Sequence, residues 1–318
     1  MSERMTVMRT TAAGEAGAVF AAAEVDRPVP LPTEVLVKVH AAGVNPVDWK
    51  IRGGVFPTGG LGAHPFVQGW DVAGTVEAGP RVTRFSPGDE VFGLLWFPRQ
   101  AGAYGEYVTA PARQFARKPA GLGMVEAGAL PMAGLTAWQT LVDVAGIGAG
   151  SKVLVTAAAG GVGHLAAQIA HARGAIVTGT ARAAKHDFLA SLGVDDAVDY
   201  TRVEVGRTVR DQDVVLDLLG GPHTIPLLDT LRPGGLLILT IGLISPELAA
   251  AAEARGVRVS PFLVEPDHQG LEALARMVDR GDLRVHVDQV FPLAEVAKAH
   301  EVGESDRTTG KLVLSVAG

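Results

Sequence analysis

The segment from residue 151 to residue 163 constrains the fold more than any other part of the chain, and it reads Ser-Lys-Val-Leu-Val-Thr-Ala-Ala-Ala-Gly-Gly-Val-Gly. Its apolar first half predicts a buried strand, and its second half predicts a tight turn that opens a helix over about residues 162–173. Glycine lets the backbone approach a ligand closely, and a helix N-terminus presents free N–H groups to an anion. We therefore expect the turn to hold a pyrophosphate, a purely structural turn being the alternative. The turn residues are Ala159, Gly160, Gly161, Val162 and Gly163.

The residues after this turn predict a second strand and indicate which cofactor is bound. Gly174 is suited to end the helix, and the run 175–180 predicts the next strand of a βαβ unit. Sites for NAD place an acidic residue at the end of that strand. Here Thr180 is followed by Arg182 and Lys185 with no acid between them. Because a guanidinium can bind a 2′-phosphate through two hydrogen bonds, we expect NADPH rather than NADH. The alternative is that both cations are simply solvated.

Length and composition allow two domains and exclude several functions. The chain has 318 residues, 47% of them hydrophobic, with a net charge of −6 and no basic stripe, so binding to nucleic acid is not expected. It has no cysteine, which excludes disulfides, cysteine-bound zinc, iron–sulfur clusters and thiol catalysis. No apolar run has the length of a membrane span, and the polar N-terminus lacks the apolar core of a signal peptide. We therefore expect a cytoplasmic protein that does not bind membranes.

The spacing of apolar residues changes along the chain and predicts an α/β protein. Strands are expected first, with a helix after them over 129–145; these strands are 33–41, 69–78, 89–95 and 105–110. Near-continuous apolar runs then predict a doubly wound parallel sheet, with strands at 152–157, 175–180, 194–200, 213–219, 235–241 and 257–264. A helix over 270–280, a short helical piece over 293–301 and a strand at 311–316 complete the chain.

The last strand has no partner in the parallel sheet, so we expect it to return to the first domain. The predicted domains are residues 1–125, 126–265 and 266–318, the third being the return to the first. The active site is then expected between the domains, over the carboxyl ends of the parallel strands.

Short motifs follow one another in order along nearly the whole chain. They are Gly43-Val-Asn45-Pro-Val-Asp48, Pro65-Phe-Val-Gln-Gly69-Trp-Asp71, Pro87-Gly88-Asp89, Gly102-Ala-Tyr104-Gly-Glu106, the glycine-rich turn, Asp213-Val-Val-Leu-Asp217 and Thr309-Gly310-Lys311. In this order and spacing, the chain resembles the zinc-independent quinone oxidoreductase branch of the medium-chain dehydrogenase/reductase superfamily. The resemblance implies a GroES-like β-rich catalytic domain, a Rossmann NADP-binding domain and a homodimer.

The same resemblance implies that the reaction needs no metal. The zinc enzymes of the superfamily have a cysteine ligand where this chain has Asn45, and Gly-His-Glu where it has Gly69-Trp70-Asp71. His40 and His64 have no identifiable partners for a site that needs about three protein ligands. Without a Lewis acid, hydride from NADPH is expected to go to acceptors that are already electrophilic, namely quinones or α,β-unsaturated carbonyl compounds.

The resemblance also implies catalytic positions, which we take to be Asn45, Asp48 and Tyr104. Asn45 is expected to face the nicotinamide and to donate to the oxygen of the acceptor; an Asn-Pro turn former is the alternative. Asp48 is expected to order its loop and the neighbouring Arg52 rather than to move protons. Many relatives carry a tyrosine where this chain has Phe56. Tyr104 is a substitute for that phenol, or simply packs between strands.

The remaining cofactor contacts follow from the resemblance in the same way. Thr136 is expected beside the nicotinamide carboxamide, and Tyr200 near the adenosine. Lys311 is expected close to the cofactor, with a salt bridge that closes a domain as the alternative. The loops after the later parallel strands are expected to meet the nicotinamide through Leu219, Ile241, Gly242, Phe262 and Leu263.

Two other functions remain open at this stage. An enoyl-thioester reductase would need a basic entrance for a phosphopantetheine arm, and the sequence shows no clear cluster. A non-catalytic NADPH-binding sensor or structural protein on the same fold is the second, since a fold does not determine a function.

Overall fold

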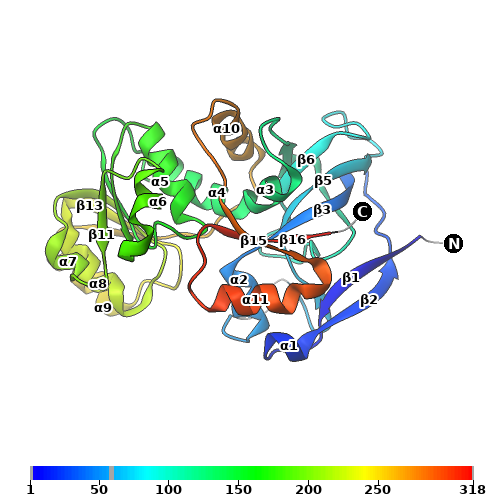
Figure 1. The fold of residues 1–318 in the computed structure, drawn as a ribbon, viewed down its shortest axis with the longest axis horizontal. Helices are drawn as coiled ribbons and strands as arrows, with labels where there is room; N and C mark the ends of the chain where they lie inside the picture. Colours follow the sequence, from blue (N-terminus) through cyan, green and yellow to red (C-terminus); the bar gives the residue numbers. More distant parts are fainter. Residues whose placement is uncertain (1–2, 57–60, 317–318) are drawn as a thin grey trace. The chain divides into compact units, whose positions relative to one another are not determined.

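The computed structural model describes residues 3–56 and 61–316, and the chain divides into two compact units (Figure 1). Unit 1 comprises Met1–Leu135 together with Glu265–Gly318, and unit 2 comprises Thr136–Val264. The chain thus leaves unit 1 once and returns to it. Among the described residues, no helix is long and apolar enough to cross a membrane.

Unit 2 is built on a parallel sheet of six strands in the order β11-β10-β9-β12-β13-β14. The strands are β9 (Lys152–Val155), β10 (Ile176–Ala181), β11 (Asp196–Asp199), β12 (Gln212–Asp217), β13 (Leu231–Leu239) and β14 (Arg258–Pro261). All six predicted strands are therefore present. The strand order reverses between β9 and β12, and ligands of such sheets bind beside this point, at the carboxyl ends of the strands.

Helices and short 3₁₀ turns connect these strands. They are α5 (Gly163–Ala172), η3 (Ala183–Lys185), α6 (His186–Ala190), α7 (Val205–Thr208), η4 (Gly221–His223), α8 (Thr224–Leu227), η5 (Leu228–Thr230) and α9 (Pro246–Ala254). Leucines and valines from β12, β13, α8 and α9 form one apolar cluster. The strands are near-continuous apolar runs because helices pack against the sheet, and side chains on a covered face are buried.

Unit 1 contains a mostly antiparallel sheet in the order β15-β16-β3-β5-β6-β8, with β7 also paired to β3. Its strands are β3 (Glu34–Val44), β5 (Asp71–Ala78), β6 (Glu90–Leu94), β7 (Tyr107–Pro111), β8 (Phe115–Arg117), β15 (Val287–Pro292) and β16 (Lys311–Ser315). Gly74 of β5 is required by close packing, because a Cβ there would lie 2.0 Å from the carbonyl oxygen of Lys38.

The C-terminal segment completes this sheet, as predicted. Strand β16 pairs antiparallel with β3, placing Leu312 opposite Val44 and Leu314 opposite Ala42. On its other side β16 pairs in parallel with β15, a strand that the sequence patterns did not reveal. The tail also contains α10 (His268–Asp279), η6 (Leu293–Glu295) and α11 (Val296–Glu304).

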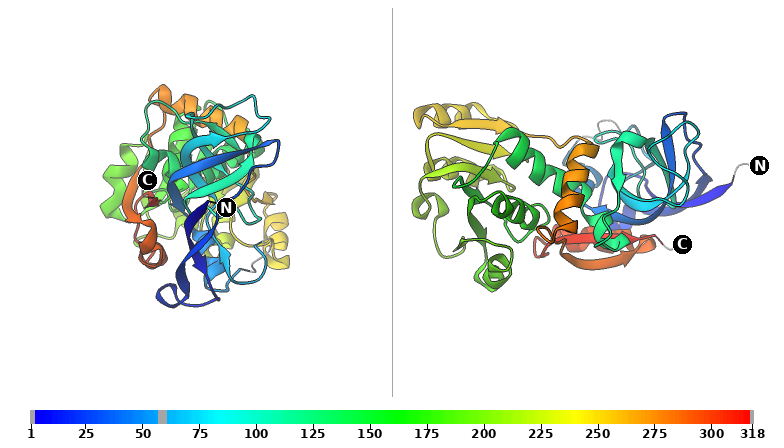
Figure 2. Two further views of the ribbon diagram at one scale, coloured as in Figure 1. Left: turned by 90° about the vertical axis from the view of Figure 1, so that its right-hand side faces the viewer. Right: turned by 90° about the horizontal axis from the view of Figure 1, so that it is seen from above.

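An N-terminal hairpin adds a second, three-stranded sheet to unit 1. Strands β1 (Arg4–Thr10) and β2 (Phe20–Asp26) pair along their whole length, and β1 also pairs with β4 (Phe66–Val67). Figure 2 shows this hairpin in dark blue, side by side over its length. The short helices α1 (Ala16–Val19) and α2 (Pro46–Arg52) and the 3₁₀ turn η1 (Ala112–Gln114) complete this part of the chain.

The helix expected over 129–145 is three shorter elements. They are α3 (Met124–Ala129), α4 (Pro131–Trp138) and a π-helix, η2 (Gln139–Val144). Helix α3 belongs to unit 1 because Gly128 packs against β3: a Cβ on this glycine would lie 2.8 Å from the Cβ of Ala41. The first unit therefore continues to Leu135, beyond the boundary expected at 125.

Candidate functional site

The glycine-rich turn joins β9 to α5 in unit 2. Ala157 has a φ of +47°, so an alanine occupies the left-handed position where a tight turn favours glycine. Helix α5 begins at Gly163. In the part of unit 2 that the structure describes, the backbone N–H groups of Gly161, Val162 and Gly163 have no backbone acceptor. Three free donors at a helix start are what an anionic ligand needs.

The two glycines that were expected to admit the ligand have different roles. A Cβ on Gly163 would lie 2.3 Å from the carbonyl oxygen of Ala157 and 2.7 Å from the Cα of Ala158. This glycine is therefore required for packing the helix on the turn, and its role in letting the backbone approach a ligand stays a prediction. A Cβ on Gly160 would meet only the Ala157 oxygen, at 3.2 Å. Gly160 therefore keeps the role that we expected.

The ends of β10 and β11 carry the predicted phosphate-reading residues. Arg182 is exposed directly after β10, and its Nε donates to the hydroxyl of Tyr200, which follows β11, at 3.1 Å. Lys185 ends the 3₁₀ turn η3 that Arg182 begins. Thr180 is buried in β10, and its Oγ1 accepts the N–H of Ala157 at 3.2 Å, which ties the second strand to the turn.

The loops at the carboxyl ends of the strands on the other side of the parallel sheet, β12, β13 and β14, are apolar. Leu219, Leu243 and Leu263 are exposed in the loops after β12, β13 and β14, which are adjacent strands. Ile241 and Phe262 lie in the same loops and are partly buried. Gly242 has a φ of +93°, a conformation that only glycine adopts without strain.

The loop after β12 depends on Asp217, a residue that sequence reasoning noted but did not assign. Its buried carboxylate accepts the N–H groups of Leu219 and Gly220, at 3.0 and 3.1 Å, and the hydroxyl of Thr224 at 2.7 Å. The Thr156 hydroxyl, at the start of the glycine-rich turn, accepts the Leu218 N–H at 2.8 Å. Asp217 thus shapes the loop that presents Leu219. An acid at the end of an apolar strand was the available signal.

Thr136 is the first residue of unit 2 and lies within α4. It is 7% exposed, and its carbonyl oxygen accepts the hydroxyl of Thr140 at 2.6 Å. The structure therefore places the threonine in a helix, at the unit boundary.

Unit 1 holds a buried cluster of polar side chains around Asn45. This residue precedes α2, where the Asp48 carboxylate accepts its backbone N–H at 2.6 Å. Its side-chain Nδ2 donates to Asp71 at 2.9 Å, and its Oδ1 accepts a hydrogen bond from Lys311. All four side chains are at least 97% buried. The sequence motifs placed Asn45, Asp48 and Lys311 here but missed Asp71 as a member.

Lys311 joins the last strand to this cluster. Its Nζ lies 3.7 Å from Asp71 Oδ2 and donates to the carbonyl oxygen of Val44 at 3.1 Å. The other Asp71 oxygen accepts the N–H of Met132 at 2.7 Å. Burial raises the pKa of Asp71 and lowers the pKa of Lys311, while their mutual attraction opposes both changes. Of the two roles considered for Lys311, the structure therefore shows the salt bridge, within unit 1.

Asp48 orders its loop, as expected, but does not pair with Arg52. The guanidinium of Arg52 instead pairs with Glu304 of α11 and donates to the carbonyl oxygen of Gly14. Burial raises the pKa of Asp48 to about 7, against the hydrogen bond from Asn45. Asp48 Oδ1 has no hydrogen bond of good geometry among the described residues, although the Tyr104 hydroxyl lies close enough to influence that pKa.

Tyr104 lies in the interior of unit 1, with its hydroxyl 3.4 Å from His300 Nε2 of α11. Burial, with the nearby Asp48 charge, holds the pKa of this phenol well above its ordinary value. Burial beside Arg52 lowers the pKa of His300 to about 3, so the imidazole is neutral at physiological pH. The structure thus favours the packing role for Tyr104, because a buried phenol with a raised pKa is a poor proton donor.

The positions that hold zinc in the resembled enzymes carry Asn45, Trp70 and Asp71 here, and their side chains have other partners. Asn45 and Asp71 are bonded to each other and to Lys311, and Trp70 is fully buried with its Nε1 donating to the carbonyl oxygen of Arg99 at 2.7 Å. No three His, Cys, Asp or Glu side chains in residues 3–56 and 61–316 are grouped to bind a metal ion. The donors present do not fit zinc.

Comparison with known proteins places this site in a family. Residues 31–120 match the alcohol dehydrogenase GroES-like domain, and residues 192–314 match the family described as zinc-binding dehydrogenase. The chain is 33% identical over 308 residues to the chloroplast envelope quinone oxidoreductase homolog of Arabidopsis thaliana, covering 92% of each chain. It is 34% identical to the chloroplastic NADPH-dependent alkenal/one oxidoreductase of Arabidopsis thaliana, covering 88% of this chain and 72% of that protein.

A solved structure shows the same relationship. The quinone oxidoreductase from Coxiella burnetii superposes with a TM-score of 0.92 at 32% identity, covering 99% of this chain and all of that one. The chain belongs to the medium-chain dehydrogenase/reductase superfamily, in its quinone oxidoreductase-like branch. It is thus an oxidoreductase of a family that uses nicotinamide cofactors.

Proposed function

We propose that the protein is an NADPH-dependent reductase that transfers hydride to quinones or α,β-unsaturated carbonyl compounds without zinc. One observation carries this proposal: the carboxyl edge of the parallel sheet is divided by polarity. Free N–H groups lie at its middle, Arg182 and Tyr200 at one end, and Leu219, Leu243 and Leu263 at the other. This order suits a phosphorylated adenosine, a pyrophosphate and an uncharged ring, in sequence along one dinucleotide.

The residues present fit this cofactor. The turn from Ala159 to Gly163 would hold the pyrophosphate, Arg182 and Lys185 the 2′-phosphate, and Tyr200 the adenosine. Asp217 fixes the loop of Leu219 by accepting its N–H, which prepares an apolar surface for the nicotinamide beside Ile241, Gly242, Phe262 and Leu263. Thr136 is assigned to the carboxamide. When bound, NADPH supplies a hydride from its nicotinamide ring.

Asn45 is proposed to polarise the acceptor oxygen. Its Nδ2 gives one N–H to Asp71, which leaves a second N–H for a ligand. Lys311 donates to the amide oxygen of the same side chain, and this strengthens the amide as a donor, because hydrogen bonds in a chain polarise one another. Lys311 and Asp48 therefore act as positioning residues. The proton that completes the reduction comes from water, since Tyr104 lies in the interior and its raised pKa makes its phenol a weaker acid than usual.

The zinc-free mechanism follows from the donor set. Lys311 already supplies a positive charge to Asp71, and Asn45 and Trp70 are poor zinc ligands. Acceptors that need a Lewis acid, such as saturated aldehydes, are expected to be unreactive.

The test is to follow NADPH and NADH absorbance with matched quinones, alkenals and saturated aldehydes, before and after dialysis against a chelator. The proposal predicts turnover of quinones or alkenals that prefers NADPH and survives the chelator. Turnover of saturated aldehydes that is lost on chelation would contradict it. Tight NADPH binding with no turnover of any acceptor would favour the sensor function, and turnover confined to enoyl thioesters would favour the thioester reductase.

We also propose that the protein is a homodimer. Strand β14 lies at one edge of the parallel sheet, and an unpaired edge invites pairing with another chain. Analytical ultracentrifugation at micromolar concentration distinguishes a dimer from a monomer. The expected cytoplasmic location stays a prediction, and both plant relatives above carry names that refer to the chloroplast.

A further inference from the structure

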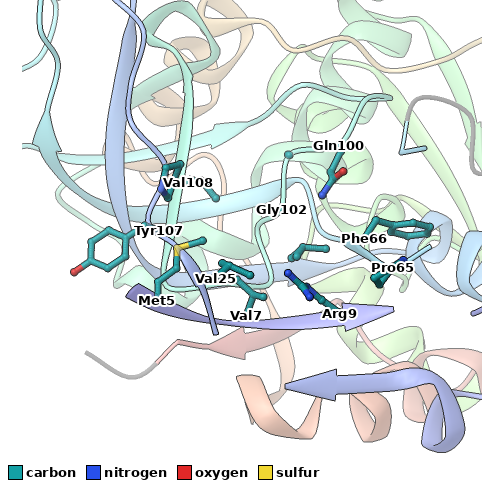
Figure 3. A pocket seen from close by; sticks show the side chains of 13 residues that line it. Met5, Val7, Arg9, Val25, Pro65, Phe66, Gln100, Gly102, Tyr107 and Val108 are labelled. Carbon is teal, nitrogen blue, oxygen red and sulfur yellow. The ribbon is translucent and has the colours of Figure 1, made fainter. Parts of the chain in front are cut away.

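A cavity lies in unit 1, at the N-terminal hairpin. Its volume is about 280 Å³, and Figure 3 shows its lining side chains. Met5, Val7 and Arg9 line it from β1, at alternate positions and therefore on one face of the strand. Residues 65–67 line it beside them, and 100–102 and Val108 line another side. None of these residues belongs to the cluster around Asn45.

Arg9 is an unusual residue for this face. Its strand neighbours are apolar: Ala21 is opposite it on β2 and Val67 is opposite it on β4, and Val7 precedes it on the same face. Among the described residues, no carboxylate lies within ion-pair distance of its guanidinium, and no side-chain hydrogen bond involves it. By contrast, Arg4 on the same strand pairs with Asp26 at 3.0 Å. Arg9 is only partly buried, and its guanidinium nitrogens do not belong to the buried atoms that lack a hydrogen-bond partner, so they stay open to solvent and to an anionic ligand.

Gln100 and Tyr107 are the other residues with polar side chains that line the cavity. Figure 3 shows the ends of the Arg9 and Gln100 side chains both directed toward the middle of the cavity, with apolar side chains around them. A guanidinium binds a carboxylate through two parallel hydrogen bonds, and the Gln100 amide can donate a further one. The remaining wall, made by Met5, Val7 and Phe66, offers only apolar contact.

We propose that this cavity binds an amphipathic carboxylate, such as a medium-chain fatty acid, with its head on Arg9 and its chain against β1. The size agrees: at about 30 Å³ for each water-sized group, the cavity has room for roughly nine such groups. Each methylene that leaves water strengthens binding about fourfold. This site is independent of the proposed reductase activity.

The experiment uses calorimetric titration of the full chain with octanoate, octanol and acetate. Octanoate is expected to bind at least tenfold more tightly than either of the others, because octanol lacks the carboxylate and acetate lacks the alkyl chain. Arg9→Gln is expected to weaken octanoate binding by about ten- to a hundredfold, since a charge-assisted hydrogen-bond pair is lost. Arg81→Gln is the matched control: it removes the same charge from an exposed position that does not line the cavity.

Three results would overturn the proposal. Octanoate binding that is unchanged in Arg9→Gln would place the ligand elsewhere, and octanol binding as tight as octanoate would show an apolar cavity with no carboxylate site. Failure of octanoate to bind the wild-type chain would also reject it. Val25→Trp, which fills the cavity while Arg9 is retained, provides a second variant, and it too is expected to lose octanoate binding. Circular dichroism checks that both variants fold.

Discussion

Lys311 Nζ lies 3.7 Å from Asp71 Oδ2, and both side chains are at least 97% buried. The ammonium comes from the last strand and the carboxylate from β5, so this pair joins the C-terminal segment to the first sheet of unit 1. Asn45 links the two through both ends of its amide. The arrangement keeps a proposed catalytic amide in one orientation by means of two opposite charges.

Replacing Lys311 with methionine is expected to destabilise unit 1 by about 3–5 kcal/mol, because Asp71 is left as an uncompensated buried charge. The double variant Lys311→Met with Asp71→Asn should recover a large part of this loss. Urea unfolding followed by tryptophan fluorescence measures both, since three of the four tryptophans, Trp49, Trp70 and Trp96, lie in unit 1. Lys298→Met, at an exposed site paired with Glu295, should stay within about 0.5 kcal/mol of the wild type. A double variant less stable than the single one would contradict the pairing.

Asp48→Asn is expected to change how stability depends on pH. The pKa of Asp48 is about 7 in the folded chain and about 4 when unfolded, so the folded state binds more protons between these values. Its contribution is therefore present at low pH and lost as pH rises through 7. The variant should gain stability relative to the wild type from pH 4 to pH 7, by on the order of a few kcal/mol. A difference that does not vary over this range would show that Asp48 is ionised throughout.

His300→Gln is expected to act in the opposite direction. Its folded pKa of about 3 lies below the unfolded value, so the unfolded state binds more protons between about 3 and 6.5. This group stabilises the fold above pH 6.5, and that contribution is lost on acidification. The variant should therefore lose less stability between pH 6.5 and pH 3 than the wild type loses. Acid unfolding curves of the two proteins test this, and parallel curves would refute it.

Arg182→Ala combined with Lys185→Ala is expected to weaken NADPH binding by about ten- to a hundredfold and to leave NADH binding nearly unchanged, because only NADPH carries the 2′-phosphate. Fluorescence titration with each cofactor gives the two constants. Arg202→Ala is a suitable control, since Arg202 is an exposed arginine that pairs with Asp199 in the same region. Equal losses for both cofactors would show that Arg182 and Lys185 do not read the phosphate.

Gly163→Ala and Gly160→Ala separate packing from ligand binding at the turn. The Gly163 variant forces a Cβ to 2.3 Å from a backbone oxygen. We therefore expect the free energy of unfolding to fall by about 1–3 kcal/mol. The Gly160 variant meets its closest atom at 3.2 Å and should fold normally while binding NADPH less tightly. Thermal unfolding measures the stability of both variants, and titration with NADPH measures their cofactor binding. A fully stable Gly163→Ala would refute its packing role.

The parallel sheet was predictable because its strands are short apolar runs separated by helices, and few other folds have this pattern. The return of the last strand also followed, since Lys311–Ser315 had no place in that sheet. Strands β15 and β2 were not predicted: β15 alternates weakly and is largely exposed, and β2 is rich in alanine. In both cases partners, rather than local propensity, determine the strand.

Some residues of the candidate site could likewise be predicted from the sequence, and others could not. Local motifs identified Asn45, Asp48 and the glycine-rich turn, because each belongs to a short segment with a characteristic pattern. The contacts of Asp71, Arg52 and His300 join residues that are far apart in the chain, and a single sequence carries no signal of such pairings. The difference between Gly160 and Gly163 depends on how closely each packs against Ala157, at 3.2 and 2.3 Å for an added Cβ, which only coordinates provide.

The return of β16 to unit 1 has a consequence for synthesis. During translation, β3 and the pair of Asn45 and Asp71 emerge early, but Lys311 and β16, the strand that pairs with β3, emerge only after unit 2. Unit 2 is continuous in sequence and can fold while unit 1 still has an open sheet edge and an unneutralised carboxylate. The part of unit 1 that precedes unit 2 therefore waits for Lys311–Ser315 to leave the ribosome, and until then it is the part most in need of protection from aggregation.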